Sequence, residues 1–351
     1  MCTCACYQPN QRKHQMNFTQ LKTVILSQFA RTNSVAYLVL GKPGGGKSAL
    51  CREVVAAMGG TEANTIEFNA STRDPVDVLG TPNNRGEYTQ WVPPLEFWKL
   101  RRGVGKCFLI LEELTDGPIP MQNALCRVIQ DRYAGSLALS DELYIVASGN
   151  RTEDKSGANR LTTKLGNRMR VHTFEESVPA WVKWALDNNI DPVLIQFIRY
   201  RPKALSDFDP NRPNGINPTP RSWASVSLID PALPPDLFFA ECAGSVGEAY
   251  AAEYVAFRKL YSELVSFEDV VLNPTGTPVP EKLDVQYALV GSLSHNVTPG
   301  NVDRVAKYVD RMAKDFANMF WLDASRKNTK LKATKPWITW AASNANALMG
   351  A

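Results

Sequence analysis

The chain has 351 residues, 44% of them apolar, and this length exceeds what a single hydrophobic core usually holds. We therefore expect a globular protein with two or three packed units. The formal net charge of +4 comes from 39 basic and 35 acidic residues without a block of one sign, so charge alone predicts no nucleic-acid-binding tail. No apolar run approaches the roughly 20 residues that span a bilayer, and the first residues lack a secretory signal. These features predict a cytoplasmic protein with no membrane segment.

The seven cysteines do not predict a closed disulfide framework, because their number is odd. Four of them lie in apolar segments and fit reduced thiols of a core: Cys51, Cys107, Cys126 and Cys242. The other three are Cys2, Cys4 and Cys6. Their spacing lacks the C-x2-C form of a zinc site, so a frayed terminus is favoured over a metal site. We expect residues 1–15 to be disordered.

The first half of the chain alternates apolar runs that predict strands with segments of helical periodicity. Residues 16–30 have helical spacing, residues 35–40 (VAYLVL) form an apolar run typical of a buried strand, and residues 48–58 are helical again. Further strands are predicted at 65–71, 106–111, 142–150 and, as a fifth candidate, 170–175. This alternation favours an α/β fold with a mainly parallel sheet covered on both faces, whose functional site lies at the carboxyl ends of the strands.

Two further features divide the chain. Residues 77–98 are rich in turn residues and predict a hairpin inserted into the α/β part. After about residue 178 helical periodicity replaces the strands. We therefore expect a core at 16–178, a helical lid at 179–235 and a helical C-terminal region at 236–351.

The segment from Gly41 to Ser48, GKPGGGKS, matches the phosphate-binding motif G-x-x-x-x-G-K-[ST] and lies between a predicted strand and a predicted helix. Glycines leave the backbone amides free to wrap a triphosphate, and the helix N-terminus adds partial positive charge. Lys47 is expected to reach the β- and γ-phosphates of ATP, and the Ser48 hydroxyl to bind Mg²⁺. The predicted nucleotide-binding residues are Gly41, Gly44, Gly45, Gly46, Lys47, Ser48 and Ala49. The alternative is a tight glycine turn with a solvated lysine.

Two adjacent carboxylates follow the strand predicted at 106–111. In P-loop ATPases the first carboxylate of such a pair holds the Mg²⁺ shell, and the second takes a proton from the attacking water. We assign Glu112 to the metal and Glu113 to the proton transfer. An exposed acidic pair without a catalytic role is the alternative.

With these motifs, residues 16–235 resemble the AAA+ ATPases and, within them, the MoxR-like branch. The acidic pair is followed by a helical segment at 118–132, and residues 145–150 (IVASGN) look like the sensor 1 strand of that family. The resemblance implies an AAA+ αβα core with a helical lid. It also implies that Asn150 orients the attacking water against the γ-phosphate. Glu112 departs from the pattern, because the family usually has aspartate there.

Two segments further along resemble the arginine motifs of the family. Residues 161–174 imply that Arg168 is an arginine finger, supplied to the nucleotide of an adjacent subunit, with Arg170 as the competing candidate. Residues 217–223 (NPTPRSW) resemble the sensor 2 motif and imply that Arg221 contacts the γ-phosphate from the start of a lid helix. The proline before Arg221 suits the first position of a helix.

The MoxR-like branch also carries hairpins that face a pore or a partner. The insertion at 77–98 and a second candidate around 132–142 fit this feature. Tyr88, Trp91 and Trp98 are therefore candidate partner contacts, and packing at the base of the hairpin is an equally good interpretation.

The resemblance implies a ring of identical subunits, a homo-hexamer, that hydrolyses ATP to remodel or activate a partner protein. In this family the partner often has a von Willebrand factor A-type domain. A nucleic-acid-associated AAA+ motor is the alternative, but the mild charge and the lack of a basic stripe with aromatics disfavour it. A P-loop kinase is a third possibility, and the acidic pair and the sensor-like residues favour water over a small molecule as the phosphate acceptor.

Overall fold

The computed structural model describes residues 15–84, 86–87, 89–154, 159–212, 215–262 and 265–346. The chain divides into two compact units between Glu176 and Ser177. We call the first the sheet unit and the second the helical unit. The predicted roles of Tyr88 and of the N-terminal cysteines Cys2, Cys4 and Cys6 lie outside the described residues. So does the predicted disorder of residues 1–15, apart from Gln15, which lies in a strand.

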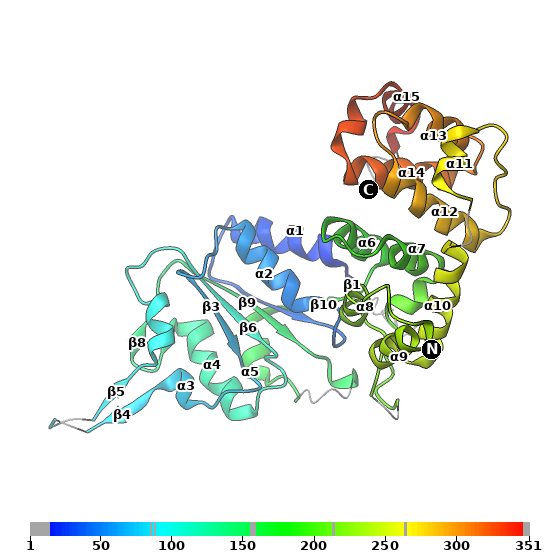
Figure 1. Ribbon diagram of the computed structural model, residues 1–351. Helices are drawn as coiled ribbons and strands as arrows, with labels where there is room; N and C mark the ends of the chain where they lie inside the picture. Colours follow the sequence, from blue (N-terminus) through cyan, green and yellow to red (C-terminus); the bar gives the residue numbers. More distant parts are fainter. Residues whose placement is uncertain are drawn as a thin grey trace, which may run out of the picture. The chain divides into compact units, whose positions relative to one another are not determined.

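Six strands form one parallel sheet in the spatial order β1, β10, β2, β9, β6, β3 (Figure 1). Their bounds are Gln15–Met16 (β1), Ala36–Leu40 (β2), Thr65–Asn69 (β3), Cys107–Glu112 (β6), Leu143–Gly149 (β9) and Met169–Phe174 (β10). The five strands predicted from the sequence are confirmed. The edge strand β1 was not predicted, because two residues are too few to show a pattern.

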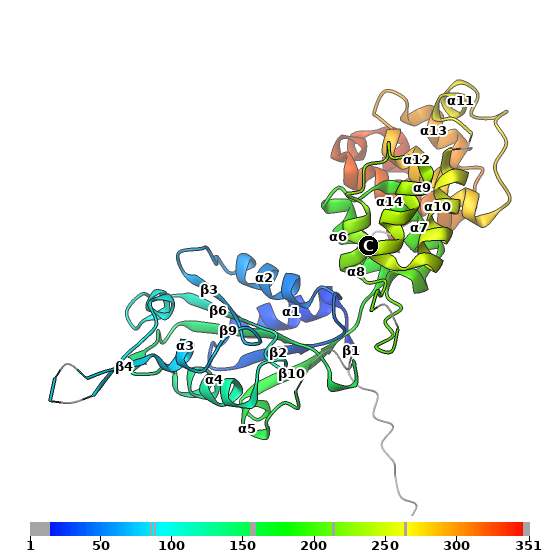
Figure 2. The same ribbon diagram turned by 60° about the horizontal axis from the view of Figure 1, so that its bottom comes forward.

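Helices cover both faces of the sheet (Figures 1 and 2). One face carries α1 (Phe18–Phe29) and α2 (Lys47–Ala57), and the other carries α3 (Val76–Leu79), α4 (Ile119–Asp131) and α5 (Thr163–Gly166). Val39 and Ile110 pack with the first group, whereas Leu38 and Leu111, their neighbours in the sequence, pack with the second. Strands that are apolar on both faces are typical of a parallel sheet between two helical layers.

Two small hairpins extend from this core. Strands β4 (Thr81–Asn83) and β5 (Gln90–Val92) pair in the predicted insertion and are followed by the 3-10 helix η1 (Leu95–Leu100). Strands β7 (Tyr133–Ala134) and β8 (Leu137–Ala138) form the second predicted hairpin. The Ser136 hydroxyl donates a 2.7 Å hydrogen bond to the Trp91 carbonyl and so links the two hairpins. Both predicted hairpins are confirmed.

The helical unit contains no strand among its described residues. Its helices are α6 (Val178–Asp187), α7 (Pro192–Tyr200), α8 (Pro220–Val226), α9 (Pro235–Val246), α10 (Glu248–Ser262), α11 (Phe267–Leu272), α12 (Leu283–Asn296), α13 (Val302–Val309), α14 (Lys314–Lys327) and α15 (Lys335–Ser343). Short 3-10 turns add η3 (Pro202–Leu205) and η4 (Thr329–Ala333), and the sheet unit contains η2 (Thr152–Asp154). The predicted fold class, an α/β core with a parallel sheet followed by a helical region, is confirmed.

Two apolar clusters build the helical unit. The first surrounds Phe197 and Trp223 and includes side chains of α6 to α10, and the second surrounds Phe320 and Trp321 and includes side chains of α11 to α15. Helix α12 contributes Ala288 to the first cluster and Leu289 to the second. In the part of the chain that the structure describes, no helix is both long and apolar enough to cross a bilayer.

Candidate nucleotide site

The glycine loop joins β2 to α2 and occupies residues 41–46. Gly44 has a φ of 71° and Gly46 a φ of 103°, which are left-handed values that residues with a Cβ adopt at a cost. Gly46 is the N-cap of α2 and supplies no side-chain hydrogen bond to the first turn. The first amide N–H groups of the helix are therefore available to an anion, as a phosphate site requires.

The Lys47 side chain folds back over the glycine loop and donates hydrogen bonds to its carbonyl groups. The side chain is buried, and its Nζ donates to the carbonyl oxygens of Gly41 at 2.9 Å and Lys42 at 2.6 Å. A third bond, also 2.9 Å, goes to Oδ1 of Asn150 at the end of β9. A buried ammonium group that donates to carbonyl and amide oxygens can exchange them for phosphate, because an anionic acceptor forms stronger hydrogen bonds with it.

Glu112 lies beside Ser48 at the end of β6. Its Oε2 accepts hydrogen bonds from the hydroxyls of Ser48 and of Ser148, the latter at 2.6 Å. The side chain is buried, yet no hydrogen bond reaches its Oε1. A buried carboxylate oxygen without a donor is costly and is typical of a site that receives a cation.

The residues at this point are oxygen ligands of the kind that Mg²⁺ uses. Across the described ranges, no group of three or more His, Cys, Asp or Glu side chains could hold a metal without help. Mg²⁺ is usually held by one or two protein oxygens together with substrate phosphates and water. The Ser48 hydroxyl and the open oxygen of Glu112 match that requirement.

Glu113 faces a different environment from its neighbour. The side chain is exposed, and the backbone φ is 51°, an uncommon value for a residue other than glycine. Its Oε2 accepts hydrogen bonds from Asn69 Nδ2 at 3.2 Å and from Ser71 Oγ at 2.5 Å. The two predicted carboxylates are therefore brought to the same strand end but held separately, one buried and one exposed.

Asn150 connects Lys47 to Thr115 and Asp116, two residues that were not predicted from the sequence. Its Nδ2 donates to Asp116 Oδ2 at 2.7 Å, while its Oδ1 accepts from Lys47. The Thr115 hydroxyl bonds both the carbonyl and the amide of Asn150, at 2.9 and 2.8 Å. The predicted Lys47, Ser48, Glu112, Glu113 and Asn150 thus lie together at the carboxyl ends of neighbouring strands.

A Cβ at Gly45 would lie 2.5 Å from Oε1 of Glu176, so a larger residue at this position would require the Glu176 side chain to move. That oxygen is buried and, like Glu112 Oε1, has no hydrogen-bond partner. Glu176 was not predicted from the sequence, since nothing in its spacing relates it to the glycine loop. The phosphate loop is therefore backed by an acidic group at the end of the sheet unit.

Arg168 does not belong to this cluster. It precedes β10 directly, and Met169 pairs with Ala36 at the start of β2, whereas the glycine loop follows the end of that strand. Five residues of β2, at about 3.3 Å each, separate the two positions. Arg168 instead donates to Gln130 Oε1 and to the Lys164 carbonyl. Arg168 therefore lies at the other end of the sheet from the glycine loop of its own chain.

The other two arginines lie in different surroundings. Arg170 donates to Gln28 Oε1 at 3.1 Å and to the Tyr37 hydroxyl at 3.0 Å, on the face covered by α1. Arg221 is exposed in the first turn of α8, whose N-cap Thr219 forms a capping box with Ser222. The predicted helix start is confirmed, and the proposed contact of Arg221 with nucleotide stays a prediction.

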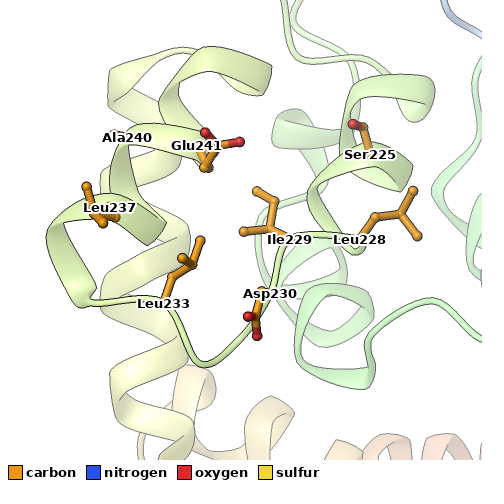
Figure 3. Close-up of a pocket in the computed structure, with 8 residues that line it drawn as sticks. All are labelled: Ser225, Leu228, Ile229, Asp230, Leu233, Leu237, Ala240 and Glu241. Carbon is orange, nitrogen blue, oxygen red and sulfur yellow. The ribbon is translucent and has the colours of Figure 1, made fainter.

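Two large cavities lie within the helical unit. One, of about 500 Å³, lies between α8 and α9 (Figure 3). It is lined by Ser225, Leu228, Ile229, Asp230, Leu233, Leu237, Ala240 and Glu241. A second cavity of about 740 Å³ has charged walls, but Arg199 there is paired with Asp323, and Arg326 with Asp187. Neither cavity contains a predicted site residue.

Comparison with known proteins gives only distant structural matches. No family model and no curated protein matches the sequence. The structure is similar to NtrX from Brucella abortus in complex with ATP, at 14% identity over 93% of this chain and 67% of NtrX, with a TM-score of 0.38. The ADP complex of NtrX gives 16% identity, coverage of 93% and 68%, and a TM-score of 0.37. Hsp104 with ATPγS and FITC casein gives 17% identity over 48% of this chain and 34% of Hsp104, with a TM-score of 0.36.

Proposed function

We propose that the sheet unit binds ATP with Mg²⁺ and hydrolyses it. The observation that carries this proposal is the meeting of the Lys47 ammonium, the Ser48 hydroxyl and the open oxygen of Glu112 at one end of the sheet. Together they offer a cation for phosphate and two oxygens for a metal, beside a helix N-terminus.

Each residue then has a distinct task. The amides of the glycine loop and Lys47 bind the phosphates, and Ser48 and Glu112 hold Mg²⁺. When bound, the metal offsets the negative charge of the β- and γ-phosphates. Glu113 accepts the proton of the attacking water, and Asn150 orients that water. Asn69 and Ser71 hold Glu113 until it takes up this role.

We further propose that the chain is a MoxR-like AAA+ ATPase that acts as a homo-hexameric ring. The order of the motifs supports this assignment, and so does the location of Arg168 at the end of the sheet opposite its own glycine loop. A catalytic arginine at that end needs the site of an adjacent subunit. Arg221 would contact the γ-phosphate from the helical unit, and the partner would be a protein with a von Willebrand factor A-type domain.

Phosphate release from ATP by the purified chain, without an added acceptor, tests hydrolysis and distinguishes a hydrolase from a kinase. Glu113→Gln should bind ATP like the wild type but release phosphate at least about a hundredfold more slowly, because the general base is lost. Lys22→Ala, which removes a half-exposed lysine of α1, is the control and should leave both properties unchanged. Loss of ATP binding in Glu113→Gln would contradict its assigned role.

A mixing experiment tests the shared site. Arg168→Ala should abolish phosphate release, and so should Glu113→Gln, each on its own. Mixed rings contain some sites with both an intact Glu113 and an intact neighbouring Arg168, so part of the activity should return. Absence of rescue at every mixing ratio would argue against Arg168 as a finger.

A further inference from the structure

Arg52 lies on α2, one helical turn after Ser48, between two carboxylates. Its Nε donates to both carboxylate oxygens of Glu67, at 2.9 and 3.0 Å, and its Nη2 donates to Oε2 at 2.8 Å. The same Nη2 is 3.8 Å from Glu112 Oε1, the oxygen that lacks a hydrogen bond. Arg52 therefore lies within ion-pair distance of the open oxygen but donates no hydrogen bond to it.

The strand order explains this arrangement. Glu67 is on the edge strand β3, which pairs with β6 so that Asn69 lies opposite Glu112. A guanidinium group can bind one carboxylate through two parallel N–H groups. In Arg52 the N–H groups of Nε and Nη2 are used in this way by Glu67. These hydrogen bonds also raise the pKa of Arg52 above its ordinary value, so the group stays charged.

We propose that Glu67 restrains Arg52 from donating a hydrogen bond to Glu112, and thereby keeps the carboxylate oxygen of Glu112 open for Mg²⁺. This inference rests on the proposed binding of ATP with Mg²⁺. Arg52 is a competitor of the metal for Glu112, and Glu67 is the positioning residue that holds it back. We call the pair of Arg52 and Glu67 the gate, because it controls whether the Glu112 oxygen is free to bind the metal. Neither side chain contacts nucleotide in this proposal.

The surroundings allow the competing hydrogen bond to form. Arg52 Nη2 is already only 3.8 Å from Glu112 Oε1, so a small shift of the guanidinium group would form the hydrogen bond. A cavity of about 450 Å³ also adjoins Arg52 and Glu67. The Arg52 side chain is 53% exposed and that of Glu67 44% exposed, whereas that of Glu112 is only 10% exposed. If Arg52 is released from Glu67, we expect it to bind the carboxylate of Glu112, because electrostatic attraction is stronger at a buried group from which water is excluded.

Three variants test the gate in the full chain. Glu67→Ala releases Arg52, Arg52→Ala removes the competitor, and the double variant removes both. The readout is binding of a slowly hydrolysed fluorescent ATP analogue at graded free Mg²⁺, which gives the Mg²⁺ concentration for half-maximal enhancement. Glu53→Gln is the matched control, because it removes a carboxylate from a surface ion pair of the same helix, with Lys22, that does not involve Glu112.

We expect Glu67→Ala to raise the half-maximal Mg²⁺ concentration about fivefold, the size of one partly exposed charge interaction. Arg52→Ala should leave it unchanged or lower it, and the double variant should behave like Arg52→Ala. A purely structural role of Glu67 would not be rescued by removing a second residue. An unchanged Glu67→Ala variant, or a double variant as weak as Glu67→Ala, would overturn the inference. Wild-type chain that fails to bind the analogue at any Mg²⁺ concentration would instead overturn the proposed function.

Discussion

Two buried carboxylates of this chain, Asp323 in the helical unit and Glu112 in the sheet unit, are satisfied in opposite ways. In the helical unit, Asp323 is 4% exposed and accepts two hydrogen bonds from Arg199, which is itself 15% exposed. In the sheet unit, Glu112 keeps one buried oxygen without a hydrogen bond. A closed buried pair fixes the fold, whereas an open buried group costs stability and is kept where a ligand completes it. The contrast separates structural charge from functional charge.

The largest expected effect is on the closed pair. Asp323→Ala leaves Arg199 buried without its partner and should lower the free energy of unfolding of the helical unit by about 3–5 kcal/mol. Hydrogen exchange of the amides of α7 and α14 measures this loss. Asp187→Ala is the control, because its pair with Arg326 is more exposed and should contribute less than about 1 kcal/mol. An equal decrease in the free energy of unfolding in the two variants would contradict the view that the buried pair contributes more than the exposed one.

The open group should respond in the opposite way. Glu112→Gln removes a buried charge that has no full partner, so the free energy of unfolding should fall by less than about 1 kcal/mol or should rise. The Mg²⁺-dependent part of ATP affinity should decrease at least about tenfold, because a metal ligand is lost. Hydrogen exchange of β6 and nucleotide titration measure the two properties. A strongly destabilised variant would show that Glu112 is structural.

A smaller effect is expected where Asn69 holds Glu113. Asn69→Ala removes one hydrogen bond from the exposed carboxylate and should raise the rate of ATP hydrolysis about two- to tenfold, as a bond of about 0.5–1.5 kcal/mol allows. ATP affinity should not change, because Asn69 does not contact the glycine loop in any described hydrogen bond. A decrease in rate would mean that Asn69 positions Glu113 for the reaction.

The smallest effect comes from two histidines, one in each unit. Burial lowers the pKa of His172 in the sheet unit and of His295 in the helical unit, and the nearby cations Arg170 and Lys327 lower them further. Each imidazole therefore binds a proton less readily in the folded chain than in the unfolded chain, where its ordinary pKa is about 6.5. Stability is fully present above that pH and decreases as the pH falls through it.

Hydrogen exchange at pH 7.5 and 5.5 detects this loss in each unit separately. His172→Gln should reduce the pH dependence for β10 and leave that of the helical unit unchanged. If the variant retains the full pH dependence at β10, groups other than His172 are responsible.

The sequence predicted the parts of the site that depend on local pattern. The glycine loop and the five longer strands are each marked by residues within a few positions, and parallel order then brings Lys47, Glu112 and Asn150 to one edge. Asn69, Asp116 and Arg52 were missed because their roles depend on which strands are neighbours. The Asn–Ala–Ser end of the strand at 65–71 was a usable signal, since it follows a strand in the same sheet as the acidic pair.

The helical unit was less accessible to prediction. Helical periodicity gives the helices, but it does not show that α9 and α10 pack with α6 to α8 around Trp223. Nor does it pair Arg199 with Asp323, which lie 124 residues apart. Contacts of that kind depend on the whole fold and are not marked by a local pattern. The only motif predicted within the helical unit is the one that contains Arg221.

The central claim is that the open groups of the sheet unit receive ATP with Mg²⁺, and a calorimetric titration tests it most directly. The purified chain should bind ATP at one site per chain, more tightly with Mg²⁺ than with a chelator, and Lys47→Ala should lose at least about a hundredfold in affinity as a buried charge-assisted contact is removed. A folded wild-type chain that takes up no ATP, or a Lys47→Ala variant that binds as well as the wild type, would contradict the account.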